Sequence, residues 1–85
     1  TTVSLLNNPV TSNITLDFLS GSRSNIRVRM VDMSGRLVST KTLSVQSGAQ
    51  RLQLDIPSGT SSGLYVLQLT DESGQVIFKE KIIKL

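Results

Sequence analysis

The chain has 85 residues and contains no His, Cys or Trp, and its three aromatic residues are Phe18, Tyr65 and Phe78. These absences exclude zinc sites built from Cys and His, disulfides, redox pairs and Ser-His-Asp or Cys-His catalysis. The net charge of +3 comes from basic residues that are mostly scattered along the sequence. Without aromatic side chains to stack on bases, this small excess predicts a solvated surface and no nucleic-acid binding.

The composition favours strands over helices. Ser and Thr together number 21, whereas Ala occurs once, and no window shows a sustained helical period. No apolar run approaches the ~18–20 residues that a membrane-spanning helix needs, so no transmembrane segment is expected. The first residues, Thr1–Val3, also lack the basic and apolar regions of a secretory signal peptide.

Short runs with a period of two alternate with turn signals along the whole chain, which is typical of a sandwich or barrel. Three of the runs alternate cleanly between apolar and polar residues. The predicted strands are Val3–Leu6, Ile14–Phe18, Ile26–Met30, Arg36–Val45, Arg51–Ile56, Leu64–Leu69 and Gln75–Leu85. The sequence therefore predicts an all-β fold, either a sandwich or a barrel.

Three of these runs carry further information. Leu64–Leu69 is apolar on nearly both faces, which indicates a central strand, and Arg36–Val45 has the weak pattern of an edge strand. The last run starts with Val76 and Phe78 on one face. Its phase then becomes ambiguous, because Glu80 falls on the same face.

Two segments of the chain repeat one pattern, a strand followed by Asp-x-Ser-Gly and a second strand. The central residues are Asp32–Gly35 in the first copy and Asp71–Gly74 in the second. Asp bonds the backbone two residues on, and Gly adopts the positive φ that a Cβ disfavours, so each copy predicts a tight hairpin. A calcium site is the alternative, but it needs more oxygen ligands than one such turn supplies.

No set of residues suggests catalysis. Five of the six acids fall on outward faces or in turns, and nothing in the spacing of the acids brings two carboxyl groups together in a cleft. The three aromatic side chains are in phase with core aliphatics, so we expect them to pack inside and not to form a sugar-binding platform. Tyr65 follows Gly63 at the start of the most apolar strand, which is where immunoglobulin-like folds place a tyrosine corner.

The C-terminus concentrates three of the four lysines beside large aliphatic residues, in the segment Lys79–Leu85. One interpretation is a last edge strand whose lysines prevent unwanted strand pairing. The other is a recognition strand that a partner captures by strand addition. The residue pattern alone leaves both open.

Five motifs follow one another along the chain. They are Asn8-Pro9-Val10, the strand and turn Val31–Val38, Leu54–Pro57, Gly63–Val66 and Lys79–Leu85. In this order and spacing they resemble the C-terminal sorting domain of type IX secretion system cargo proteins from Bacteroidetes. The resemblance extends from about Asn7 to Leu85, although Leu6-Asn7 stands where that family often has Tyr-Pro.

The resemblance implies a small immunoglobulin-like antiparallel sandwich of about seven strands, which agrees with the number of predicted strands. It also implies a single non-catalytic domain, residues 1–85, at the C-terminal end of a larger secreted protein. Such a domain directs its cargo from the periplasm through the outer-membrane translocon to the cell surface or the medium. Its partners would be the translocon and shuttle proteins of the system, and a sortase-like cysteine endopeptidase that removes the domain afterwards. No cofactor or metal is implied.

The resemblance also assigns residues to roles and raises the recognition-strand interpretation above the alternative. The residues expected to contact the translocon are Lys79, Lys81, Ile82, Ile83, Lys84 and Leu85. The family-motif residues expected to be structural are Asn8, Pro9, Asp32, Gly35, Gly63 and Tyr65. The alternative function is an immunoglobulin-like module of a surface protein that binds glycans, mediates adhesion or acts as a spacer.

Overall fold

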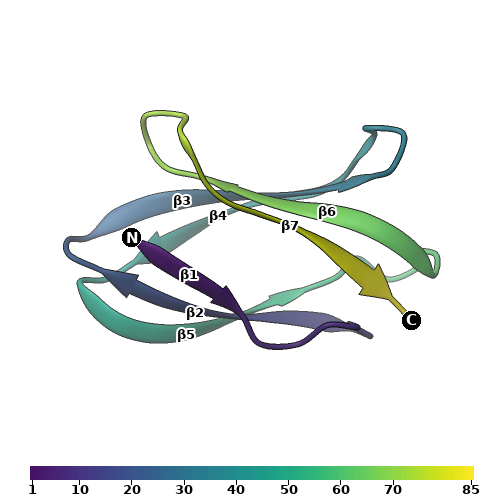
Figure 1. Ribbon diagram of the computed structural model, residues 1–85, viewed down its shortest axis with the longest axis horizontal. Helices are drawn as coiled ribbons and strands as arrows, with labels where there is room; N and C mark the ends of the chain where they lie inside the picture. The colour runs from purple at the N-terminus through teal and green to yellow at the C-terminus, as the bar shows by residue number, and fades with distance from the viewer.

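The computed structural model describes all 85 residues as seven β-strands that form two layers (Figure 1). It contains no helix long and apolar enough to cross a membrane. The strands are β1 (Thr2–Leu5), β2 (Asn13–Ser20), β3 (Ser24–Asp32), β4 (Leu37–Val45), β5 (Gly48–Asp55), β6 (Gly63–Thr70) and β7 (Val76–Lys84).

The first layer, sheet A, has the strand order β1-β2-β5, and the second, sheet B, has the order β4-β3-β6-β7. All neighbouring strands are antiparallel. The chain passes from one sheet to the other after β2, after β4 and after β5. Two antiparallel sheets joined by such crossings form an immunoglobulin-like sandwich, so the predicted fold class is confirmed.

The core lies between the two sheets and follows the alternation in the sequence. Leu16 and Phe18 of β2 face Leu67 and Leu69 of β6, and all four are at most 2% exposed. β6 lies between β3 and β7, which confirms that it is an interior strand, and β4 lies at an edge of sheet B as expected. Since the chain has no disulfide, this apolar layer is the main source of its stability.

Two β-bulges explain where the period of two fails. The pairing of β3 with β4 skips Val38, and the pairing of β6 with β7 skips Ile77. A bulge places one extra residue in one strand and so shifts the alternation beyond it. The expectation that Val76 and Phe78 share a face is therefore wrong: Val76 is 47% exposed, whereas Phe78 packs against the core.

The repeated Asp-x-Ser-Gly pattern forms two hairpins of the same geometry, one at each end of sheet B. Gly35 and Gly74 both have a φ of 88°, in the region that L-residues rarely adopt. In each hairpin the bulge comes just after the turn, and bulges bend strands. Figure 1 shows that both hairpin ends rise away from the sandwich on the outer side of sheet B.

Candidate functional site

The expected recognition residues lie on β7, an edge strand of sheet B. Lys79, Lys81 and Ile83 alternate along the strand and pair with β6 residues that face outward. All three are exposed, and the exposed fraction of Ile83 is 47%. These side chains are accessible to a partner.

The remaining residues of the segment have different surroundings. Ile82 is 0% exposed and belongs to the core, opposite Tyr65 in the β6–β7 ladder. Lys84 is partly buried, and its Nζ donates a hydrogen bond to the carbonyl of Leu85 at 2.7 Å. Leu85 is 61% exposed. In the folded domain Ile82 therefore holds β7 against the sandwich while its neighbours are presented to solvent.

The Asn8 side chain joins the beginning of the domain to its end. Its Oδ1 accepts a hydrogen bond from the backbone N–H of Ile83 at 3.0 Å, and its Nδ2 donates to the carbonyl of Lys81 at 3.2 Å. The Asn8–Pro9 peptide bond is cis. An amide side chain that accepts and donates in this way replaces one step of a β-ladder along the outer edge of β7.

Val10 extends this contact toward the C-terminus. Its N–H donates to the carbonyl of Ile83 at 2.8 Å, and its carbonyl accepts from the N–H of Leu85 at 2.9 Å. We call the segment Asn8–Val10 the clamp. It occupies the outer edge of β7 from Lys81 onward, so a partner strand could pair there only after the clamp had moved.

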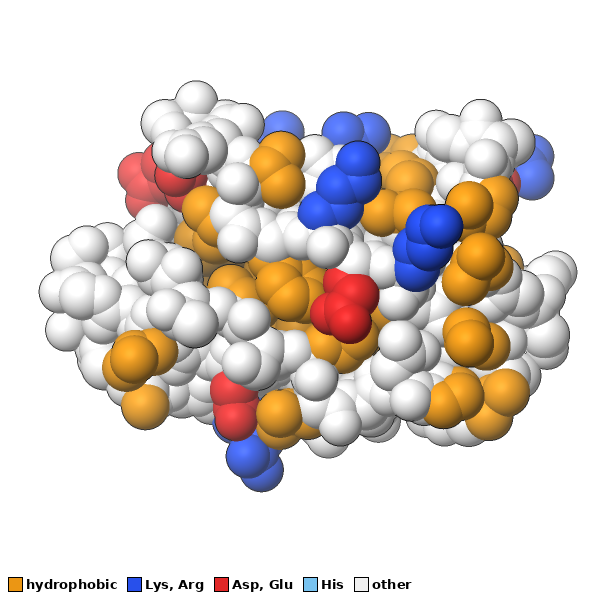
Figure 2. Space-filling view, in the orientation of Figure 1, with side chains coloured by type: hydrophobic (Ala, Val, Ile, Leu, Met, Phe, Trp, Pro, Cys, Tyr) orange, Lys and Arg blue, Asp and Glu red, His pale blue; other side chains and the backbone are white.

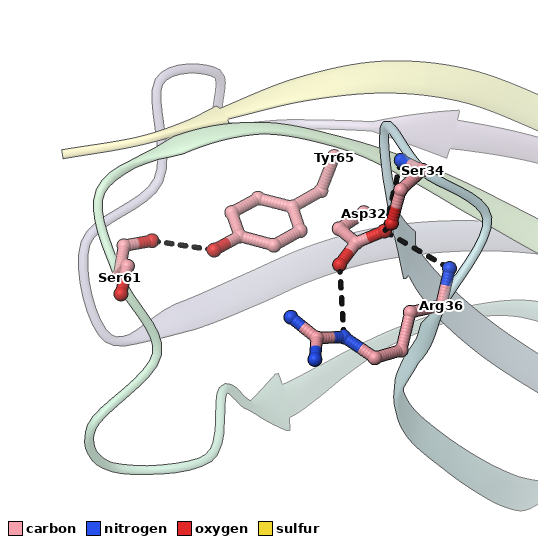
Figure 3. A network of polar contacts seen from close by, with 5 residues as sticks. All are labelled: Asp32, Ser34, Arg36, Ser61 and Tyr65. Atoms are coloured by element: carbon pink, nitrogen blue, oxygen red, sulfur yellow. Dashed lines mark hydrogen bonds and ion pairs between the residues drawn. The ribbon is translucent and has the colours of Figure 1, made fainter.

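Tyr65 forms the expected corner at the start of β6. Its hydroxyl donates a hydrogen bond of 2.6 Å to the carbonyl of Ser61, four residues earlier, and its ring is buried (Figure 3). Gly63, between the two, has a φ of 156°. These residues shape the entry into the central strand, which agrees with the structural role that the resemblance implies.

Asp32 is the centre of the first hairpin. Its Oδ1 accepts from the N–H and the Oγ of Ser34, at 2.9 and 2.6 Å, and from the N–H of Arg36 at 2.9 Å. Its Oδ2 accepts from the Nε of Arg36 at 3.3 Å (Figure 3). The Ser34 hydroxyl, followed by the Arg36 N–H, lowers the pKa of Asp32 to about 2.

Asp71 repeats this arrangement in the second hairpin. Its Oδ1 accepts from the N–H and Oγ of Ser73, at 2.9 and 2.6 Å, and from the N–H of Gln75 at 3.0 Å. The Ser73 hydroxyl is the main reason that the pKa of Asp71 is lowered. Both carboxylates are thus engaged by their own turns, and no group of three His, Cys, Asp or Glu side chains converges on a common point. The geometry favours the hairpin interpretation over a calcium site.

Strand register collects charges that are scattered in the sequence. Arg27 and Arg29 of β3 lie on the outer face of sheet B together with Lys79 and Lys81 of β7. Sequence reasoning did not connect these two pairs, because about 50 residues separate them in the chain. Figure 2 shows that most Lys and Arg side chains of this view lie along the side formed by sheet B.

The outer face of sheet A differs in charge. Its ionisable residues are Asp17, Arg51 and Asp55. Asp17 and Arg51 form an ion pair with 2.8 Å between Oδ1 and Nε, and this contact lowers the pKa of the carboxyl group. The excess positive charge of the molecule is therefore concentrated on sheet B.

The family is shown by a comparison with known protein families. The family described as "Secretion system C-terminal sorting domain" matches residues 6–84. The chain belongs to this family. The resemblance found in the sequence is thereby confirmed, and the domain is of a class that sorts secreted or cell-surface proteins.

Solved structures support the fold of this sorting domain. Dimeric latent PorU from Porphyromonas gingivalis matches 98% of the chain with a TM-score of 0.79 and 24% identity. A β-glucosidase from Listeria innocua in complex with isofagomine matches 96% with a TM-score of 0.52 and 12% identity. The sorting domain spans 9% of the first protein and 16% of the second. No curated protein matches the sequence.

Proposed function

We propose that this sorting domain is the non-catalytic signal by which the type IX translocon recognises a cargo protein and moves it across the outer membrane. The observation that carries the proposal is the family match over residues 6–84. The geometry of β7 is compatible with it. Lys79, Lys81 and Ile83 are presented outward on a strand that Ile82 and the clamp hold in place.

The route and the later steps belong to the same proposal. The cargo passes through the periplasm, shuttle proteins of the system receive the domain, and a sortase-like cysteine endopeptidase removes it at the cell surface. The chain contains neither Cys nor His, so it lacks the residues with which such an endopeptidase acts. The resemblance in the sequence supports these steps.

The test is a reporter fusion. Thr1–Leu85 is attached to the C-terminus of a fluorescent protein that carries an N-terminal export signal, in a bacterium that has a type IX system. The fusion is expected in the medium or on the cell surface, with a decrease in mass if the domain is removed. Retention of the intact, folded fusion in the periplasm would contradict the proposal.

Deleting Lys79–Leu85 is a poor variant for this test. The deletion also removes Ile82 from the core and leaves the clamp without partners, so loss of export could reflect unfolding. The double variant Lys79→Glu/Lys81→Glu changes exposed side chains alone, so we expect it to keep the fold. We expect it to remain in the periplasm.

A glycan-binding module is less well supported. Phe18 and Tyr65 are at most 7% exposed, and Phe78 packs against the core. The domain therefore presents no freely exposed aromatic ring on which a sugar could stack.

A further inference from the structure

The outer face of sheet B has two halves. Its basic half is a diagonal band of four cations, since Arg29 and Lys79 flank Gln68 in one row of the ladder and Arg27 and Lys81 lie in the rows on either side. No acidic residue lies on the strands of this face. The apolar half consists of Val31, Leu37, Leu64, Val66 and Ile83.

The apolar half is a continuous exposed patch. Leu64 and Ile83 are direct cross-strand partners and are 41% and 47% exposed. Leu37, Val31 and Val66 form the adjacent row, and Leu37 is 47% exposed. An exposed apolar patch with a charged border is typical of a protein interaction site.

The two hairpins form walls at the ends of this face. Figure 1 shows both of them rising above sheet B, and Figure 2 shows the hollow that lies between them. Shallow hollows of about 300 and 390 Å³ lie beside Arg27, one toward the Asp71–Gly74 turn and one toward Arg29 and Thr40. We call the outer face of sheet B and the two walls the cradle.

The acids of the walls are already engaged. Asp32 and Asp71 accept hydrogen bonds within their own turns, and the Oε1 of Glu72 accepts from the N–H of Asn25 at 2.8 Å. The carboxylates therefore stiffen the walls, and the four cations of the floor have no ion-pair partner in the domain. Their positive potential is directed toward solvent.

The shape, polarity and charge of the cradle determine which kind of partner it can bind. The raised hairpins would keep a flat lipid bilayer from the floor, and a polysaccharide offers no counterpart to five aliphatic side chains. A second copy of this chain would bring two basic faces together, which like-charge repulsion disfavours. A convex protein surface with an apolar region beside a cluster of carboxylates is complementary in shape, polarity and charge.

We propose that the cradle is the surface by which the type IX machinery recognises this domain, and that its partner is a protein surface with an acidic region beside an apolar one. The proposal rests on the sorting function and deepens it. It adds Arg27, Arg29, Leu64 and Val66 to the residues of the terminal strand. Recognition thus depends on the folded four-stranded face and not on the C-terminal sequence alone.

The first experiment uses the reporter fusion with matched variants. Arg27→Gln/Arg29→Gln removes two positive charges from the cradle, and Thr2→Glu/Gln53→Glu makes the same net change on the outer face of sheet A. Leu64→Ser removes an exposed leucine from the cradle, and Leu19→Ser does so on sheet A, where Leu19 is 59% exposed. We expect the cradle variants to reduce export by about tenfold and the sheet A variants to change it by less than about twofold.

The second experiment identifies the class of partner. A photo-crosslinking residue replaces Gln68 at the centre of the cradle, and Thr15 on sheet A serves as the control position. The purified domain is mixed with outer membranes from the same bacterium. Position 68 is expected to give a crosslink that disappears when the membranes are first treated with protease, and that weakens as salt concentration rises.

The outcomes separate this proposal from the one on which it rests. If the unchanged fusion is not exported, the sorting function itself is contradicted. If it is exported and both cradle variants are exported equally well, the cradle is not the recognition surface. A protease-resistant crosslink, or one to lipopolysaccharide, overturns the protein partner. Thermal unfolding of the purified variants identifies any that have lost the fold. For those variants, the crosslink from position 68 tests the cradle in place of the export result.

Discussion

Lys41 and Glu80 occupy equivalent positions on the two edge strands of sheet B. They are 39 residues apart, which is also the distance in sequence between Asp32 and Asp71 of the two hairpins. Each pairs with a core residue, Lys41 with Val28 and Glu80 with Leu67. Their side chains thus start on the inner face of the sheet yet remain exposed at its open edges. A charge in this position obstructs pairing with another chain, because the added strand would bury it.

We therefore expect Glu80→Val to stabilise the monomer and to promote association. Valine is favoured in strands and would extend the apolar layer, so the free energy of unfolding should rise by about 0.5–1 kcal/mol. Light scattering coupled to gel filtration should show more oligomer at high protein concentration than for the unchanged domain. Glu80→Gln, which adds no apolar surface, serves as the control, and an unchanged mass for Glu80→Val would contradict the role.

Ile82 and Ile83 should respond very differently to the same substitution. Ile82 is fully buried, so Ile82→Ala should lower the free energy of unfolding by about 2–5 kcal/mol. Ile83 is 47% exposed, and Ile83→Ala should cost less than about 1 kcal/mol while reducing export. Urea unfolding measures the first effect and the reporter fusion the second. Equal losses of stability would contradict the assigned orientation of β7.

Replacing Asn8 tests the clamp. Asn8→Asp keeps an acceptor for the Ile83 N–H but loses the donor to the Lys81 carbonyl, and it places a negative charge beside that oxygen. We expect a loss of about 1–2 kcal/mol in stability and faster hydrogen exchange at the Ile83 amide. Gln46→Glu is a suitable comparison, since the Gln46 side chain is exposed and makes no hydrogen bond in the domain. An unchanged rate of hydrogen exchange at the Ile83 amide would contradict the proposed contact between the clamp and β7.

The hairpin carboxylates predict a specific acid response. The folded-state pKa of Asp32 is about 2, below the ordinary value of 3.8. A carboxyl group whose pKa is lowered by folding stabilises the fold at pH values above its ordinary pKa. This contribution is lost as the pH falls through the pKa of the folded state. The difference in the free energy of unfolding between the unchanged domain and Asp32→Asn should therefore be largest near neutral pH. It should decrease from about pH 4 to about pH 2. A pH-independent difference in urea titrations would contradict this.

The hairpin glycines can be tested against a third glycine. A Cβ at Gly35 would meet no atom within 4 Å, so the cost of Gly35→Ala comes from its φ of 88° alone, and we expect a loss of about 1 kcal/mol. Gly21→Ala also meets nothing within 4 Å and has no positive φ, so it should be neutral or slightly stabilising. Thermal unfolding of the two variants distinguishes them, and equal melting temperatures would argue against strain at Gly35.

Much of the fold follows from local pattern. The alternation of Leu16 and Phe18 with polar neighbours predicts both the strand and its buried face, and Asp32 and Gly35 predict the hairpin, because these signals act over a few residues. The sequence does not predict the bulge at Ile77, because in a sequence one inserted residue cannot be distinguished from an end of the two-residue period.

Less of the candidate site could be predicted from the sequence. The resemblance predicts that the terminal lysines and Ile82 all contact the translocon, yet Ile82 is buried and the lysine contacts remain a prediction. Arg27 and Arg29 join Lys79 only through the pairing of β3 with β6 and of β6 with β7. The hydrogen bond from Ile83 to Asn8 joins residues 75 positions apart, and no local pattern encodes it.

The clamp has a consequence for the order in which the domain becomes complete. Asn8 and Val10 are synthesised near the start of the domain, yet their partners are the last residues of β7. A chain interrupted anywhere before Lys81 leaves both of them unpaired and the outer edge of sheet B unfinished. Contact between the clamp and residues 81–85 thus reports that the domain has been synthesised through β7, so the last strand acquires its shape only after residues 8–85 are all present.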